Sequence, residues 1–155
     1  MADERFTPML RELACCFQAL EQLSGRHVRT LGLTPSQFDI IVTLGRQNGA
    51  GMTCGELGDQ TLITKGTLTG VLDRLELKQL IQREESREDR RSVIVRLTPA
   101  GEAPYAKVFG QHLDYLRPAF SSLDDRFMAE LTCSMQKLRE ALQQYGENHP
   151  PQDQK

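Results

Sequence analysis

The sequence lacks the features that mark membrane-spanning and exported chains. No apolar run approaches the ~20 residues that a helix needs to cross a bilayer. The acidic start MADERF is also unlike a signal peptide. The sequence therefore predicts a cytoplasmic protein with no membrane partner.

Motifs for metal sites and for catalysis are also missing. The four cysteines have no CxxC spacing of the kind found in structural zinc sites, and a cytosolic protein is expected to keep them reduced. The chain has no P-loop, no GxGxxG and no HExxH. We therefore predict no enzyme, no cofactor and no metal site.

An excess of positive charge is absent as well. The chain has 19 Lys and Arg against 21 Asp and Glu, a net charge of -2 at pH 7. Bulk charge therefore gives no indication of nucleic acid binding, and such a function has to depend on where the cations stand. At 155 residues the chain is most simply one domain, and no linker splits it.

Residues 61–97 are the most informative stretch. Apolar residues recur there at helical spacing and predict one buried helix face: Leu68, Val71, Leu72 and Leu75. The opposite face carries Gly66 and Gly70 among threonines. Glycine costs a helix interior about 1 kcal/mol relative to alanine, so two glycines on one exposed face indicate that another surface comes close. Such a face suits a DNA major groove, although a glycine-containing helix is sometimes only a close packing site.

A hairpin with a charged tip follows this helix. Ile81 stands on the first strand, and Val93, Val95 and Leu97 alternate on the second in the manner of half-buried strands. The segment EESREDRR between the strands has no hydrophobic residue. A helix followed by an arginine-tipped hairpin predicts a winged helix-turn-helix, whose arginines follow phosphates or enter a narrow minor groove. Taken alone, a charged hairpin tip is usually only solvated.

The segments TKGTLTGVLDRLE, LI and REDRRSVIVRLTPAG resemble the recognition helix and wing of the MarR-type transcriptional regulators. The wing signature of that family falls here on Asp89, Arg91, Leu97, Thr98 and Gly101. The resemblance extends in element order from about residue 6 to residue 145. It implies a homodimer whose outer helices interlock while each protomer presents one recognition helix. Such a dimer reads double-stranded DNA with an inverted repeat whose half-sites lie ~10 bp apart.

The expected fold is mainly α, a winged helix-turn-helix with flanking N- and C-terminal dimerisation helices. The winged part covers about 34–98 and the dimerisation helices about 6–31 and 99–146, within a single domain of residues 1–146. Residues 147–155 are expected to form a disordered tail. The outer helices have more apolar surface than a small winged helix can cover, which also favours a two-fold dimer.

Capping residues locate the shorter helices. Thr34 with Gln37, and Thr53 with Glu56, have the spacing of capping boxes. Thr64 is the expected cap of the recognition helix.

The last two helices are bounded less clearly. Thr98 and Pro99 suit a helix start, but Pro104 indicates a delayed start or a kink, and Pro118 is expected to disturb the end of that helix. The expected caps of the final helix are Ser122 and Asp125.

The predicted DNA contacts divide between helix and wing. We assign contacts with base edges or nearby phosphates to Thr64, Lys65, Thr67 and Thr69, and a backbone contact to Arg74. Arg91 is the candidate for the minor groove, and the family pattern implies that Asp89 holds its guanidinium by a charge-assisted hydrogen bond. Arg87 and Arg90 either touch phosphates or are only solvated.

The resemblance also implies an effector. In that family, small anionic aromatic compounds commonly bind between the dimer helices and the winged domain, which favours a repressor released by a small aromatic or heteroaromatic acid. The polar and aromatic residues expected near such a pocket are Ser24, His27, Phe38, His112 and Tyr115. In the alternative interpretation, each histidine is a core residue with satisfied hydrogen bonds.

Two other functions stay open. The segment CCFQAL resembles the first helix of the peroxide-sensing branch of the family, so Cys15 or Cys16 with Cys133 would fit a thiol-based repressor. The tyrosines typical of that branch are missing from VRTLGLTPSQF, which favours structural thiols. The low cationic charge also allows a winged-helix protein-interaction module that binds no operator.

Overall fold

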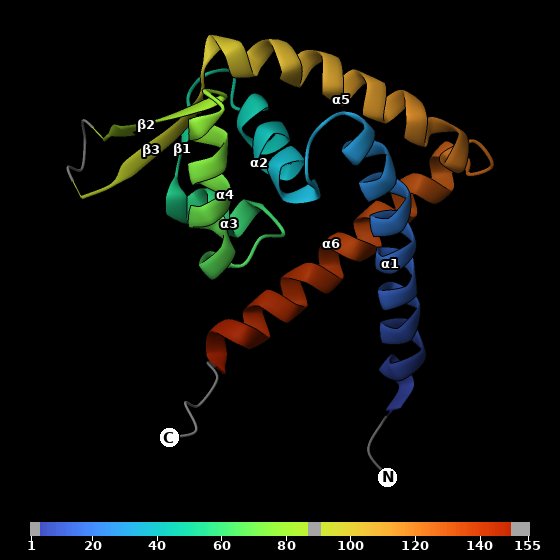
Figure 1. Cartoon of the computed structure of the whole chain (residues 1–155). Coiled ribbons are helices and arrows are strands. Elements are labelled where there is room, and N and C mark those ends of the chain that lie inside the picture. Colours follow the sequence, from blue (N-terminus) through green and yellow to red (C-terminus); the bar gives the residue numbers. More distant parts are fainter. Residues whose placement is uncertain (1–3, 87–90, 150–155) are drawn as a thin grey trace. The chain divides into compact units, whose positions relative to one another are not determined.

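The structure is a computed structural model that describes residues 4–86 and 91–149. The chain divides into two compact units, residues 1–116 and 117–155. The elements in chain order are η1 (Glu4–Phe6), α1 (Thr7–Thr30), α2 (Pro35–Gly45), β1 (Met52–Thr53), α3 (Cys54–Gln60), α4 (Lys65–Leu77), β2 (Ile81–Glu85), β3 (Val93–Leu97), α5 (Pro99–Phe120) and α6 (Asp125–Asn148) (Figure 1). The mainly α, winged helix-turn-helix architecture predicted from the sequence is confirmed.

The wing is a hairpin within a three-stranded antiparallel sheet of order β1-β3-β2. Ile81 pairs with Leu97 and Glu85 with Val93, so the two arms have equal length, and they extend away from α2 and α4 (Figure 1). The third strand, β1, pairs Met52 with Val95. The sequence did not predict β1, because two residues are too few to show alternation.

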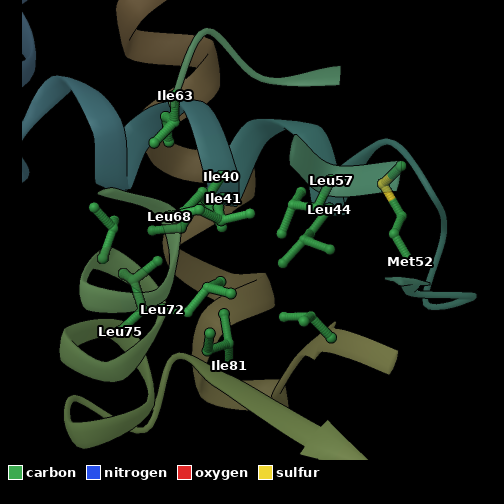
Figure 2. Packing of buried hydrophobic residues seen from close by; sticks show 12 residues of the cluster. Ile40, Ile41, Leu44, Met52, Leu57, Ile63, Leu68, Leu72, Leu75 and Ile81 are labelled. Carbon is green, nitrogen blue, oxygen red and sulfur yellow. The ribbon is translucent and has the colours of Figure 1, made fainter. Parts of the chain in front are cut away.

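The core of the first unit joins the helix-turn-helix to the sheet. Figure 2 shows Ile40 and Ile41 of α2, Leu57 of α3 and Leu72 of α4 directed into one cluster. Ile81 closes this cluster from the sheet and is 2% exposed. The apolar face predicted for α4 is therefore confirmed as the buried one.

The two predicted capping boxes are both present. The Thr34 hydroxyl accepts from the Gln37 N–H over 3.2 Å, and the Thr53 hydroxyl accepts from the Glu56 N–H over 3.1 Å. Thr64 does occupy the cap position of α4, but its side chain makes no capping hydrogen bond. Its hydroxyl lies 3.0 Å from the hydroxyl of Thr67 instead, so Thr64 is confirmed as the cap residue but not as a side-chain acceptor for the helix N–H groups.

Helix α5 begins at Pro99, so its start is not delayed by Pro104, and the alternative of a kink near Pro104 stays a prediction. The hydroxyl of Thr98 accepts from the Gly101 N–H over 3.1 Å. Gly101 also lies so close to the Leu80 carbonyl that a Cβ would collide with it. These contacts fix the start of α5 against the wing, and the helix continues past Pro118 to Phe120.

The limits predicted for α6 also need correction. Its cap is Asp124, whose carboxylate accepts from the Phe127 N–H over 2.7 Å, rather than Ser122 or Asp125. The helix ends at Asn148, whose side chain donates to the Gln144 carbonyl over 2.8 Å. The predicted tail therefore begins too early at residue 147, and residues 150–155 lie outside the described part.

Candidate DNA-binding surface and ligand cavity

Helix α4 has one buried face and one open face. A Cβ built on Gly66 or Gly70 would meet no atom within 4 Å, so neither glycine is needed for packing inside this chain. Thr67 and Thr69 on the same side are exposed. The open face of α4 can therefore be approached closely by a second surface.

The predicted contact residues of the helix all stand at the surface. Lys65 and Thr64 are exposed at the start of α4, and Arg74 is exposed near its end. Arg74 also lines a shallow groove with Arg29 and Lys78. A row of hydroxyls with cations at both ends suits base edges in the middle and phosphates at the margins.

The wing is described only in part. Arg91 is exposed just before β3, while Arg87, Asp89 and Arg90 lie outside the described residues. The predicted bond between Asp89 and Arg91 therefore stays a prediction.

Sequence reasoning missed the residue that joins the wing to α4. Nη2 of Arg83 in β2 lies 2.6 Å from Oδ1 of Asp73, and Nη1 lies 3.4 Å from Oε2 of Glu76. On the neighbouring strand, Arg96 donates to the Gly49 carbonyl over 2.6 Å. These arginines hold the wing in place, and the pattern of charges along the sequence gave no signal for it.

All five residues predicted for an effector site come together. The Nδ1 atoms of His27 and His112 lie 3.0 Å apart, and the Ser24 hydroxyl lies 3.0 Å from Nε2 of His112. The ring of Tyr115 stacks on His27 at 4.2 Å, and Phe38 meets His112 edge-on at 4.7 Å. We call these five residues the histidine cluster.

The surroundings of His112 disfavour protonation of its imidazole. His112 is 5% exposed, and burial lowers the pKa of its imidazole below the usual 6.5. The neighbouring His27 adds to this effect electrostatically. Across the short contact, one of the two Nδ1 atoms must carry the hydrogen and the other accept it.

A cavity of about 270 Å³ adjoins the cluster. Its walls come from α1, α2 and the turn before α4, and we call it the α1–α2 cavity. Ser24 and Phe38 belong to both the cluster and the cavity wall.

Comparison with known proteins identifies the family. The MarR family profile matches residues 31–92. YsmB of Bacillus subtilis (strain 168), an uncharacterized HTH-type transcriptional regulator, is 31% identical over 122 residues, which cover 78% of this chain and 82% of YsmB. The chain belongs to the MarR family.

Two solved MarR-like structures extend the match. AbsC, a MarR family transcriptional regulator from Streptomyces coelicolor, is 25% identical, with a TM-score of 0.80 over 92% of this chain and 97% of AbsC. NadR in complex with 4-hydroxyphenylacetate is also 25% identical, with a TM-score of 0.72 over 82% of this chain and 89% of NadR. This MarR-family chain is thus a DNA-binding transcriptional regulator.

The cysteines of this MarR-family protein are free thiols. Cys15 and Cys16 are exposed on α1 and Cys133 is exposed on α6, and none of them forms a disulfide. Within residues 4–86 and 91–149, no group of three or more His, Cys, Asp or Glu side chains could hold a metal ion. Over the same residues, no helix combines the length and the apolar character needed to cross a membrane.

Proposed function

We propose that this regulator is a homodimeric repressor that reads an inverted repeat with one α4 helix from each protomer. The open face of α4 carries this proposal. Gly66 and Gly70 reduce the stability of α4, although a Cβ at either position would meet no atom within 4 Å. Close approach of DNA to α4 accounts for the lack of a side chain at both positions. Thr67 and Thr69 then face base edges, while Lys65 and Arg74 bind phosphates at the two ends.

The exposed apolar side chains of the outer helices support a dimer. Met9 and Leu10 of α1 are 40% and 42% exposed, and Leu113 of α5 is 46% exposed. Side chains of this size are usually covered, and a second copy of the chain covers them in a two-fold dimer. MarR-family regulators are dimers.

The wing adds contacts beside the recognition helix. We assign the minor groove to Arg91, with Asp89 holding its guanidinium, and phosphate contacts to Arg87 and Arg90. The bond from Arg83 to Asp73 fixes the base of the wing relative to α4.

A small aromatic molecule releases the repressor from DNA. The α1–α2 cavity supports this step, because its wall includes both dimerisation-helix residues and the turn before α4. The family resemblance favours an aromatic acid, and NadR was solved with one such acid, 4-hydroxyphenylacetate.

A gel-shift titration tests the proposal. The full-length protein is mixed with the DNA beside its own gene at rising salt, and the oligomeric state is measured in parallel by light scattering. We expect a dimer and a complex whose affinity falls steeply with salt, because phosphate contacts release counterions. A protein-interaction module would give no complex at any salt concentration, and a monomeric complex would contradict the inverted-repeat proposal.

A further inference from the structure

The walls of the α1–α2 cavity are largely aromatic and aliphatic. Phe17 and Leu20 of α1 and Phe38 of α2 line it, together with Leu62 and Ile63 from the turn before α4. The volume of about 270 Å³ lies near the lower end of ordinary ligand pockets, which span ~300–1,000 Å³. The cavity therefore suits a ligand with a single ring.

The charged groups of this wall are both acidic. Glu21 and Asp39 line the cavity, and no Lys, Arg or His does so among the described residues. Burial raises the pKa of the Asp39 carboxyl above its usual 3.8, although the Leu62 N–H and the charge of Arg46 act in the opposite direction. The half-buried Asp39 carboxylate is stabilised by a cation and destabilised by a second anion.

His112 does not supply a positive charge to the cavity. It contacts two residues of the cavity wall, Phe38 edge-on and Ser24, whose hydroxyl lies 3.0 Å from Nε2 of His112. The pKa of His112 lies below its usual value because of burial, so its ring is neutral near pH 7. A carboxylate ligand would therefore enter a site with two like charges and no compensating cation on the described wall.

Asp39 also touches the DNA-reading element. Its Oδ2 accepts from the Leu62 N–H over 2.9 Å, and Leu62 stands two residues before Thr64, the cap of α4. A ligand that draws on the Asp39 carboxylate competes with this bond.

We infer that the α1–α2 cavity binds a small aromatic ammonium ion rather than an aromatic acid. The ring lies between Phe17 and Phe38, and the ammonium donates hydrogen bonds to Asp39 and Glu21. Binding weakens the hold of Asp39 on Leu62 and so disturbs the start of α4. The inference rests on the proposed function in taking this cavity as the effector site, and it replaces the aromatic acid that the family resemblance favours with an aromatic ammonium ion.

Two matched probes test the charge preference directly. Tyramine and 4-hydroxyphenylacetate both have a phenol ring with a methylene group attached. In tyramine the next carbon carries the ammonium, and in 4-hydroxyphenylacetate the next carbon is that of the carboxylate. Binding of each probe is measured by calorimetry on the full-length protein without DNA. The measurement is made at pH 8, which keeps the Asp39 carboxyl more fully ionised and the ammonium charged. We expect tyramine to bind at least tenfold more tightly. Equal binding, tighter binding of the acid, or binding of neither probe would overturn the inference.

Variants that each remove one negative charge test which carboxylate causes the tighter binding of tyramine. Asp39→Asn keeps an oxygen acceptor for the Leu62 N–H but removes the charge, and Glu21→Gln does the same at the other carboxylate. We expect Asp39→Asn to reduce tyramine affinity about tenfold and Glu21→Gln about threefold. Glu12→Gln on the exposed side of α1 is the control and should leave binding unchanged. If both cavity variants still bind tyramine more tightly than 4-hydroxyphenylacetate by the wild-type factor, Asp39 and Glu21 do not bind the ammonium.

DNA binding is measured separately. Saturating tyramine should weaken the gel-shift complex at least threefold in the wild-type protein, and no change would overturn the link to α4. DNA binding without a tyramine preference would refute this inference alone. Tyramine binding by a protein that forms no DNA complex would refute the proposed function alone.

Discussion

Arg83 in strand β2 reaches across to Asp73 in helix α4, with 2.6 Å between Nη2 and Oδ1. The side chain of Arg83 is 25% exposed and that of Asp73 is 58% exposed. Exposed ion pairs contribute at most ~1 kcal/mol to stability, so this pair is a weak stabiliser of the fold. Its consequence lies in geometry, because it connects the recognition helix to the base of the wing.

Arg83→Ala should therefore affect DNA binding more than stability. We expect the free energy of unfolding to fall by ~1 kcal/mol or less. Operator affinity should fall about tenfold, because the wing loses its fixed position beside α4. A double-mutant cycle with Asp73→Asn, measured by gel shift and urea unfolding, checks both numbers. Glu130→Gln, which breaks the exposed pair with Arg126 in α6, is the matched control. Strictly additive effects of the Arg83 and Asp73 variants on affinity would contradict the positioning role.

Alanine at Gly66 or Gly70 should separate stability from function. Neither added methyl group meets an atom of the chain within 4 Å, so each variant should be more stable by ~0.5–1 kcal/mol. The same methyl groups would stand between α4 and the DNA, and we expect operator affinity to fall at least tenfold. Thermal unfolding and gel shifts measure the two effects.

Gly110→Ala is the control for this pair, since a Cβ in the middle of α5 also meets no atom within 4 Å. It should raise stability without changing operator affinity. If Gly66→Ala and Gly70→Ala also bind DNA like the wild type, the open face of α4 is not the reading surface.

Local signals in the sequence predicted the elements that depend on near neighbours. Residue spacing gave the buried face of α4, and the capping boxes gave the starts of α2 and α3. The pairings that act over distance were not predictable. Arg83 could have paired with any of several acidic residues, and the bond from Asp39 to Leu62 spans 23 residues. At α6, the sequence indicated Ser122 and Asp125, but the cap is Asp124, which has an extended backbone and accepts from the Phe127 N–H.

The histidine cluster was predictable in membership but not in geometry. The resemblance to the MarR-type regulators, rather than residue spacing, implied that these five residues lie near one pocket. The direct contact between the two Nδ1 atoms, over a separation of 85 residues, depends on how α1 and α5 meet. Tertiary packing determines how α1 and α5 meet. The spacing of residues within one helix does not predict it.

Arg91→Ala tests the wing. Arg91 is exposed at the start of the returning strand, where its guanidinium can reach DNA beside α4. Loss of a minor-groove arginine should lower operator affinity by about one to two decades while the dimer stays intact. Gel shifts and light scattering measure both quantities. Wild-type affinity in this variant would remove the wing from the proposed interface.

The folding stability should depend on pH through His112. The pKa of this imidazole is lower in the folded protein than its usual 6.5, because burial and the neighbouring His27 disfavour the charged ring. Below about pH 6.5 the unfolded chain binds a proton at this residue that the folded chain does not bind. Stability is therefore fully present above pH 6.5 and falls as the pH drops toward the lowered pKa.

Urea unfolding at pH 7.5, 6.5 and 5.5 measures this dependence. His112→Gln removes the titrating group, so the decline in stability between pH 6.5 and 5.5 should be smaller than in the wild type. The difference cannot exceed ~1.4 kcal/mol per pH unit, the limit for one proton. Carboxyl groups such as Asp39 titrate in both proteins and cancel in the comparison. His149→Gln, at the exposed end of α6, should retain the wild-type slope. Equal slopes for wild type and His112→Gln would mean that His112 takes up its proton as readily in the folded chain as in the unfolded one, and the short contact with His27 would then have to accommodate a charged ring.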